Sequence, residues 1–495
     1  MKILLAGYNI DYDLICELKN KSAFDQDLTP ETISAAYARI SRSPKTVVDL
    51  RQDARNEVDK ARKSNQNIVF DMGHSSVAEH AVFNIDVIGV SRFLVEEIEK
   101  FRLCSFTEKS QRYVLFDRDF VIPEEIRDAG MTAAFVETIE MQNDFYHHLY
   151  EVLRPYVFEK HADLAADSAN RSLLEGWAKE DARYAISLAT ETQLGMTINA
   201  RNLELMLRRL SSMPLAEARR YAELLYKATK NIAPSLIRYA EATAYDRLTR
   251  QNLKKCADGT LSAPASVKTA KKTPELLLVG ATPKADLKTA ASLLFSSSTL
   301  PFSLCLKRVA GLKPIELKKL FKTALEKARS YDAVLREFEN VALQFEMTVS
   351  ASCFAQLKRH RMATLIAQDY DPRLGVTIPA SVRAVGRRRE FLQVIAKTND
   401  LYAKIYRKDP AAAAYVLTNA HRRRVLMKLN AREMYHVARL RSDTHAQWDI
   451  RRLSDGMLKE ARRAMPLTMM MACGKDKFPS LFEKTFQRLS KSTDV

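Results

Sequence analysis

Apolar and polar residues alternate in two stretches of the chain that lie about 260 positions apart. The alternating apolar positions are Phe83, Ile85 and Val87 in the first stretch and Leu343, Phe345, Met347 and Val349 in the second. A period of two is typical of a β-strand with one buried face. Leu94, Ile98 and Phe101 then recur at helical spacing. Each stretch is therefore predicted to be a strand that leads into a short helix.

The same order of features occurs twice. Residues 2–8, KILLAGY, predict a strand, and LLLVGATPKAD restarts this rhythm after residue 275. Residues 124–250 are predicted to be almost wholly helical. Residues 251–275 contain Gly, Ser, Pro and Lys but few large apolar residues, which favours a linker. We predict a tandem duplication: a first module at 1–250, a linker at 251–275 and a second module at 276–495. The fold class is α+β, each module being a small, mainly antiparallel sheet with long helices.

Composition narrows the classes of partner. The 495 residues are 46% apolar and 28% charged, as in ordinary globular proteins, and the net charge of +18 predicts anionic partners. Six cysteines without a CxxC pair favour neither a metal site nor a disulfide framework. Without a signal-peptide pattern or a long apolar run, we expect a cytoplasmic protein with no membrane partner.

Polar side chains gather after both predicted strands. Gln356, Arg359 and His360 share one helical face, and guanidinium groups bind phosphate and carbonyl groups well, so this face suits a nucleotide. The alternative interpretation of this face is a surface helix whose charged side chains are solvated. In the first module, Glu108, Ser110 and Arg112 alternate through an extended or turn-like segment, which suits a sugar phosphate.

Together these residues resemble the signature of the flavin-dependent thymidylate synthases. Gly73-His74 and Glu79-His80 are similar to the family's upstream GH and EH pairs, and Arg359-His360-Arg361 match the first part of its signature. The second part is matched by Ser105, Thr107, Glu108, Ser110, Arg112 and Tyr113. The downstream element is matched by Asn430-Ala431-Arg432, Arg441 and the run HAQWDIR at 445–451.

The resemblance implies reductive methylation of dUMP to dTMP, with methylenetetrahydrofolate as carbon donor, FAD as redox carrier and NADPH as reductant. It implies that Arg441 polarises the uracil carbonyl as the catalytic residue. Substrate binding is implied for Gln356, Arg359, Glu108, Ser110, Arg112 and Arg183. FAD binding is implied for His74, Ser76, Glu79, His360, Arg361, Asn430, Arg432 and His436. No metal is implied.

Each module departs from the family pattern where the other keeps it. The first module has Glu97, Lys100, Phe101 and Leu210 where the second has Gln356, Arg359, His360 and Arg441. The second module has Ala367, Asp369, Asp371 and Ala414 where the first has Glu108, Ser110, Arg112 and Arg183. In the family, the active site forms at an interface of a homotetramer. We therefore expect one composite site per chain, an inactive reciprocal site, and a homodimer that recreates four modules.

Two rival hypotheses remain. A pseudoenzyme would keep the nucleotide or flavin pocket without turnover, as the altered first-module triplet suggests. A basic nucleic-acid-binding helical protein would explain the charge and the runs Arg387-Arg388-Arg389 and Arg422-Arg423-Arg424. No recognised nucleic-acid motif accompanies these runs, so a nucleic-acid partner is not expected.

Overall fold

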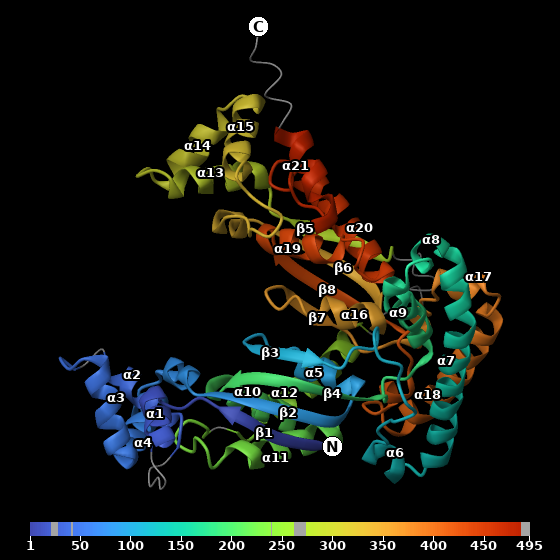
Figure 1. Cartoon of the computed structure of the whole chain (residues 1–495), viewed down its shortest axis with the longest axis horizontal. Coiled ribbons are helices and arrows are strands. Elements are labelled where there is room, and N and C mark those ends of the chain that lie inside the picture. The colour runs from blue at the N-terminus through green and yellow to red at the C-terminus, as the bar shows by residue number, and fades with distance from the viewer. Residues whose placement is uncertain (21–27, 41–42, 239, 262–273, 487–495) are drawn as a thin grey trace. The chain divides into compact units, whose positions relative to one another are not determined.

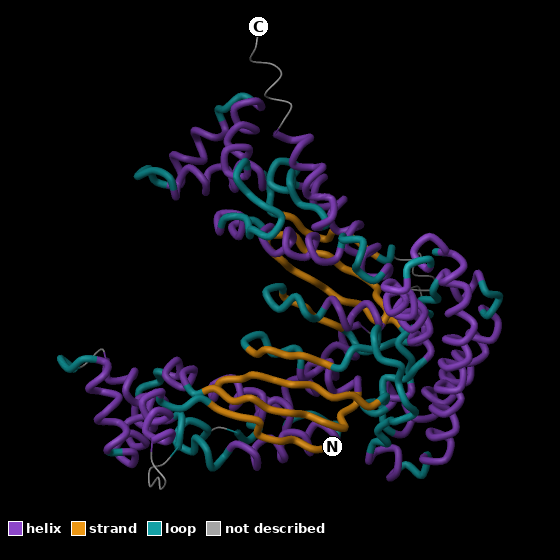
Figure 2. Tube along the Cα trace, in the orientation of Figure 1, coloured by secondary structure: helices purple, strands orange, loops and turns teal. Residues whose placement is uncertain are grey.

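The computed structural model describes residues 1–20, 28–40, 43–238, 240–261 and 274–486, and the chain divides into two compact units. Unit 1 consists of Met1–Lys268 and Pro379–Thr418, and unit 2 of Thr269–Ile378 and Asn419–Val495. Each unit contains one four-stranded antiparallel sheet with helices (Figures 1 and 2). Among the described helices, none combines the length and apolar character needed to cross a bilayer.

The sheet of unit 1 has the strand order β1-β2-β4-β3. Its strands are β1 (Lys2–Tyr8), β2 (Val82–Ser91), β3 (Cys104–Glu108) and β4 (Glu191–Asn199). Phe83, Ile85 and Val87 of β2 are buried, which confirms the predicted strand. Helix α5 (Arg92–Ile98) follows at once because Ser91 caps it, its side chain accepting from the Leu94 amide. The helix ends at Ile98, so the prediction that the helical spacing continues to Phe101 was wrong.

The helices of unit 1 include two that come from the second repeat. They are α1 (Tyr12–Asn20), α2 (Glu31–Arg39), α3 (Val47–Asn56), α4 (Val58–Gln66), α5, α6 (Glu124–Asp128), α7 (Thr132–Lys160), α8 (Ala162–Ala165), α9 (Arg171–Ala182), α10 (Ala200–Ser211), α11 (Ala216–Thr229), α12 (Ala244–Leu261), α17 (Ala380–Ala384) and α18 (Arg388–Lys408). Helix α12 covers the start of the predicted linker at 251–275, and residues 262–273 of that linker lie outside the described residues.

The prediction that residues 124–250 are almost wholly helical was wrong at β4. This strand pairs with β2 and β3, and Thr192, Leu194, Met196 and Ile198 are buried at every second position. Alternation over nine residues was visible in the sequence but was masked by the helices on either side. Pairing on both edges makes β4 a central strand of the sheet, so the first module cannot form its sheet without it.

Unit 2 repeats the sheet topology in the order β5-β6-β8-β7. Its strands are β5 (Leu276–Ala281), β6 (Ala342–Ser350), β7 (Thr364–Ala367) and β8 (Arg422–Asn430). Its helices are α13 (Ala285–Ser296), α14 (Phe302–Ala310), α15 (Pro314–Leu325), α16 (Ala351–Leu357), α19 (Ala431–Arg441), α20 (Trp448–Ala464) and α21 (Phe478–Phe486). The two equal strand orders confirm the predicted α+β fold with two tandem modules.

The compact units do not coincide with the two repeats. Segment Pro379–Thr418 belongs to the second repeat in sequence but to unit 1 in space. Its helix α18 packs along α7 (Figure 1), with the rings of Phe145 and Phe391 5.9 Å apart. Leu401, Ile405 and Tyr415 from this segment join the hydrophobic core of unit 1. The second repeat thus supplies part of the core around the first sheet.

Helices α7 and α18 are repeat equivalents of one another. Pro123 precedes α6 as Pro379 precedes α17, and Gly130 and Gly386 both adopt positive φ before the long helix. After these helices the repeats differ. Helices α8 and α9 occur in the first repeat, whereas in the described second repeat a short loop connects Lys408 to the 3-10 helix Ala413–Val416. This insertion carries Glu180, next to Arg183 of the predicted site.

Candidate functional site

The course of the strands and helices in unit 2 places Arg441, at the end of α19, near α16. Strand β6 ends at Ser350 and leads into α16, whereas β8 runs antiparallel to it and ends at Asn430, where α19 begins. An eleven-residue helix is about 16 Å long, so α19 runs back over several residues of its sheet. Arg441 is its last residue, and its Nη2 donates to the carbonyl of Gln356 at 3.3 Å.

His360 is held between a cation and an anion. Arg441 Nε donates to His360 Nε2 at 3.0 Å, and Nδ1 of the same ring lies 3.4 Å from Glu433 Oε1. Burial lowers the pKa of His360 below its usual value; Glu433 opposes this shift and Arg441 and His436 add to it. The ring is therefore neutral near pH 7. Because Nε2 accepts a hydrogen bond, the proton resides on Nδ1.

Gln356 is buried at 8% exposure on α16, and its Nε2 donates to Gln447 Oε1 at 3.3 Å. Gln447 in turn caps α20, because the same oxygen accepts from the amides of Asp449 and Ile450. The amide of Gln356 is thus fixed to the start of α20. Sequence reasoning matched Gln447 to the family motif without assigning it this role.

Two predicted arginines flank His360. Arg359 is exposed and Arg361 is half-buried, both in the turns that follow α16. The imidazole of His360 between them is buried and contacts Arg441. The two arginines of this triplet are therefore at least partly exposed to solvent, whereas its histidine is not.

Asn430, Arg432 and His436 all belong to the start of α19 or its first turns. Asn430 is the N-cap, its Oδ1 accepting from the Glu433 amide at 2.8 Å. Arg432 donates to the Val334 carbonyl and pairs with Glu339, both at 2.8 Å. His436 is exposed, with its ring edge-on to His360 at 5.7 Å. Of these three, His436 is the one that joins the group around Arg441.

In unit 1, the predicted substrate residues belong to a cluster of arginines and glutamates. Glu108, at the end of β3, forms an ion pair with Arg92 of α5 through a side chain that is 2% exposed. Arg112 follows in a turn, where its amide donates to Ser110 Oγ at 3.2 Å and its Nε donates to Glu180 Oε2 at 2.5 Å. Arg92 and Glu180 were missed from the sequence, because neither lies in a motif that the family signature covers.

Arg183 is the buried member of this cluster, 6% exposed at the start of a 3-10 helix after α9. Burial lowers the pKa of its guanidinium, Glu180 opposes this shift, and the charges of Arg112 and Arg92 add to it. Unit 1 therefore brings Arg112 and Arg183 close enough to repel one another electrostatically. Glu108 and Glu180 pair with Arg92 and Arg112, and guanidinium groups gathered in this way can bind an anionic ligand such as a phosphate.

His74, Ser76 and Glu79 lie at the other predicted element of unit 1, just before β2. His74 precedes the 3-10 helix Ser75–His80, in which Ser76 is exposed. Glu79 pairs with Arg201 at 2.5 Å, which is the equivalent of the Glu339–Arg432 pair at 2.8 Å in unit 2. Both modules therefore retain an acid–arginine pair that joins the segment just before the second strand to the helix after the fourth.

The positions predicted for an inactive reciprocal site have apolar or locally paired side chains. Leu210 is 1% exposed, and Lys100 pairs with Glu97 one helical turn away. Asp371 accepts from the guanidinium of Arg373 through both oxygens. The structure thus brings Gln356, His360, His436 and Arg441 together in unit 2, and Glu108, Ser110, Arg112 and Arg183 in unit 1.

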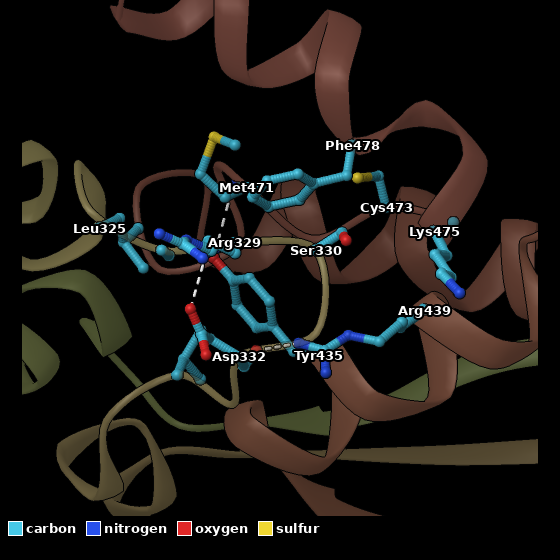
Figure 3. Close-up of a pocket in the computed structure, with 13 residues that line it drawn as sticks. Leu325, Arg329, Ser330, Asp332, Tyr435, Arg439, Met471, Cys473, Lys475 and Phe478 are labelled. Carbon is cyan, nitrogen blue, oxygen red and sulfur yellow. Dashed lines mark hydrogen bonds between the residues drawn. The ribbon is translucent and has the colours of Figure 1, made fainter.

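A separate pocket lies in unit 2 beside α19 (Figure 3). It is lined by Leu325, Ala328, Arg329, Ser330, Asp332, Val334, Tyr435, Arg439, Met471, Cys473, Gly474, Lys475 and Phe478. Arg439 donates to the carbonyl of Tyr331 at 2.9 Å, and burial raises the pKa of the Cys473 thiol to about 11. None of the residues predicted from the sequence lines this pocket.

Comparison with known proteins identifies the family. The family described as thymidylate synthase complementing protein matches residues 24–235 and 278–467. The flavin-dependent thymidylate synthase of Clostridium tetani is 32% identical over 215 residues, covering 43% of this chain and 82% of that protein. The UPF0159 protein of Chlamydia pneumoniae is 26% identical over 443 residues, covering 85% of this chain and 82% of its own length.

A solved structure of the flavin-dependent thymidylate synthase of Helicobacter pylori, complexed with FAD and dUMP, aligns with a TM-score of 0.32 and 17% identity, covering 49% of this chain and 100% of that one. The family match occurs once in each repeat, so tandem duplication applies to the family domain itself. The chain therefore belongs to the thymidylate synthase complementing protein family, the flavin-dependent thymidylate synthases, as a form with two tandem copies of the family domain.

Proposed function

We propose that this chain is a flavin-dependent thymidylate synthase that converts dUMP to dTMP in the cytoplasm, using methylenetetrahydrofolate, FAD and NADPH. The observation that carries the proposal is the position of Arg441, whose guanidinium is fixed by His360 Nε2 and the Gln356 carbonyl. A fixed cation can stabilise negative charge that builds on a uracil carbonyl without reorganising at the moment of reaction.

The second part of the proposal is that one nucleotide site per chain draws on residues of both modules. Its support is the complementary loss: Leu210 stands where the second module has Arg441, and Ala414 stands where the first has Arg183. The insertion that carries α9 is part of the same difference between the repeats. It places Glu180 beside Arg112, so the first repeat holds this arginine with a partner from the insertion. Arg112 and Arg183 would bind the phosphate, and Gln356, Arg359 and Arg441 the nucleotide.

FAD, when bound, would supply the redox chemistry, so this chain's residues need only bind and orient. The chemistry of the donor set in unit 2 fits such a group. His436 presents an exposed ring, and Arg432 keeps 37% of its side chain exposed while pairing with Glu339. An aromatic edge and a guanidinium on one helix suit a heteroaromatic cofactor with phosphates. His74, Ser76, Glu79, His360, Arg361 and Asn430 complete the proposed FAD contacts.

The test combines a spectrum with a genetic assay. The purified full chain should show flavin absorbance, oxidise NADPH faster when dUMP is added, and allow a thymidine-requiring strain to grow. Calorimetric titration should give one dUMP per chain. A yellow protein that neither forms dTMP nor supports growth would identify a pseudoenzyme instead, and two dUMP molecules per chain would contradict the one-site proposal.

A further inference from the structure

Helix α19 carries a buried carboxylate for which the proposed reaction has no use. Glu433 is 8% exposed, and its Oε1 lies 3.4 Å from Nδ1 of His360, which is 3% exposed. The opposite nitrogen of that ring accepts from Arg441 Nε at 3.0 Å. Glu433, His360 and Arg441 therefore lie next to one another as anion, neutral ring and cation inside unit 2, with a hydrogen bond at Nε2 and an ion-pair distance at Nδ1.

We propose that Glu433 is a positioning residue for Arg441, a role that rests on the proposed function. Its carboxylate holds the proton of His360 on Nδ1, which leaves Nε2 as the acceptor for the Arg441 guanidinium. Nothing in this role requires Glu433 to touch the substrate. It acts through the imidazole, as partners outside a binding site commonly fix the tautomer of a histidine.

The other protonation states of His360 are incompatible with the observed geometry. A proton on Nε2 would point at the Nε–H of Arg441 and turn the guanidinium away from the Gln356 carbonyl, which it now reaches at 3.3 Å. A charged ring would place two cations in contact inside a low-dielectric environment. His436 is a further titratable group at the ring, 5.7 Å away between ring centres, and it also disfavours a charged ring.

The first repeat supports this coupling independently. Phe101 and Leu210 stand where the second repeat has His360 and Arg441, and Asn202 stands where it has Glu433. Phenylalanine has no tautomer to fix and leucine has no charge to orient. Asn202 instead donates to the Asn199 side chain at 2.8 Å within its own helix start. All three residues of this Glu433–His360–Arg441 group are therefore replaced together in the first repeat.

The direct test reads the tautomer in the full chain labelled with [15N]histidine, with the His360→Phe variant identifying the ring signals of His360. Wild type should show a protonated Nδ1 and an unprotonated Nε2. Glu433→Ala should shift the ring toward Nε2 protonation. Glu433→Gln keeps an acceptor oxygen and should preserve the wild-type pattern. Asn202→Ala, at the equivalent position of the first repeat, is the matched control and should change nothing.

Rates of dTMP formation give the second test. Glu433→Ala should lower kcat by about tenfold, the size expected for one charge-assisted hydrogen bond, and Glu433→Gln should restore most of it. Combining Glu433→Ala with His360→Phe should cost no more than His360→Phe alone, because the two act as a unit. An unchanged tautomer in Glu433→Ala, or additive losses, would overturn the proposal. If wild type forms no dTMP, the proposed function fails, while the ring spectra still decide the role of Glu433.

Discussion

Gln142 donates a hydrogen bond from its side-chain amide to the hydroxyl of Thr398 at 2.8 Å, and the two residues occupy equivalent positions in the two repeats. The offset that relates α7 to α18 relates these residues as well. Ser187 likewise forms a β-bridge with Thr418, its equivalent at the offset of the following segment. Equivalent residues meet in this way when two copies pack about a local two-fold axis, as in a symmetric dimer. This packing now lies inside one compact unit.

The Gln142 side chain should be important for stability. It is fully buried, and its Nε2 also donates to the Val416 carbonyl at 2.9 Å. Gln142→Ala leaves the Thr398 hydroxyl and this carbonyl without that donor, so the free energy of unfolding should fall by about 1–3 kcal/mol. Chemical denaturation of the full chain measures it. Thr138→Ala, on the same helix with a local hydroxyl bond, should change stability by less than about 0.5 kcal/mol.

Arg441 and Leu210 occupy equivalent positions but should respond differently to the same substitution. Arg441→Ala should abolish dTMP formation and leave FAD absorbance in place, because the guanidinium serves the proposed chemistry. Leu210 is buried in the core of unit 1, so Leu210→Ala should cost about 2–5 kcal/mol of stability and little activity per folded molecule. Assays of dTMP alongside thermal unfolding separate the two. Loss of catalysis without loss of stability in both variants would contradict the one-site proposal.

His360 should make stability depend on pH on the acid side of neutrality. Its folded-state pKa is lowered, chiefly by burial, so the unfolded chain binds a proton more readily than the folded one. The contribution to stability is therefore complete above the unfolded pKa of about 6.5 and is lost as the pH falls through the folded value. Unfolding curves between pH 7.5 and 5 should show this loss. In His360→Phe the pH dependence over the same range should be weaker.

Each repeat contains a serine that joins the helix after its second strand to a later acidic residue. Ser350 Oγ accepts from the Cys353 amide at 3.0 Å and donates to Asp449 at 2.6 Å; Ser91 does the same with the Leu94 amide and Glu217. Ser350→Ala should cost about 1–3 kcal/mol, since it removes a helix cap and leaves a buried carboxylate without this donor.

Ser91→Ala should cost a similar amount, because this serine also caps a helix and donates to a buried carboxylate. Ser480→Ala, at an exposed position of α21, serves as the control and should leave the unfolding midpoint unchanged. A stable Ser350→Ala variant would show that the serine–acid bond is dispensable in the folded chain.

Local patterns predicted the strands that alternate between polar and apolar residues, and they did so because one face of β2 and of β6 is buried. They failed at β4, where helical neighbours concealed nine alternating residues, and at the end of α5, where Phe101 continues the apolar spacing beyond the helix. The candidate residues came from spacing and family resemblance. Their partners Arg92, Glu180 and Glu433 did not, because a charged residue outside a motif has no distinguishing pattern in one sequence.

The sequence by itself determined that the chain is duplicated and which chemistry-bearing residues each copy keeps, since both are properties of residue order. The tertiary structure alone decided that α18 of the second repeat completes the core around the first sheet. It also decided that the His360 ring links Glu433 to Arg441. These arrangements depend on long-range contacts between residues some 70 to 260 positions apart, which no local period encodes.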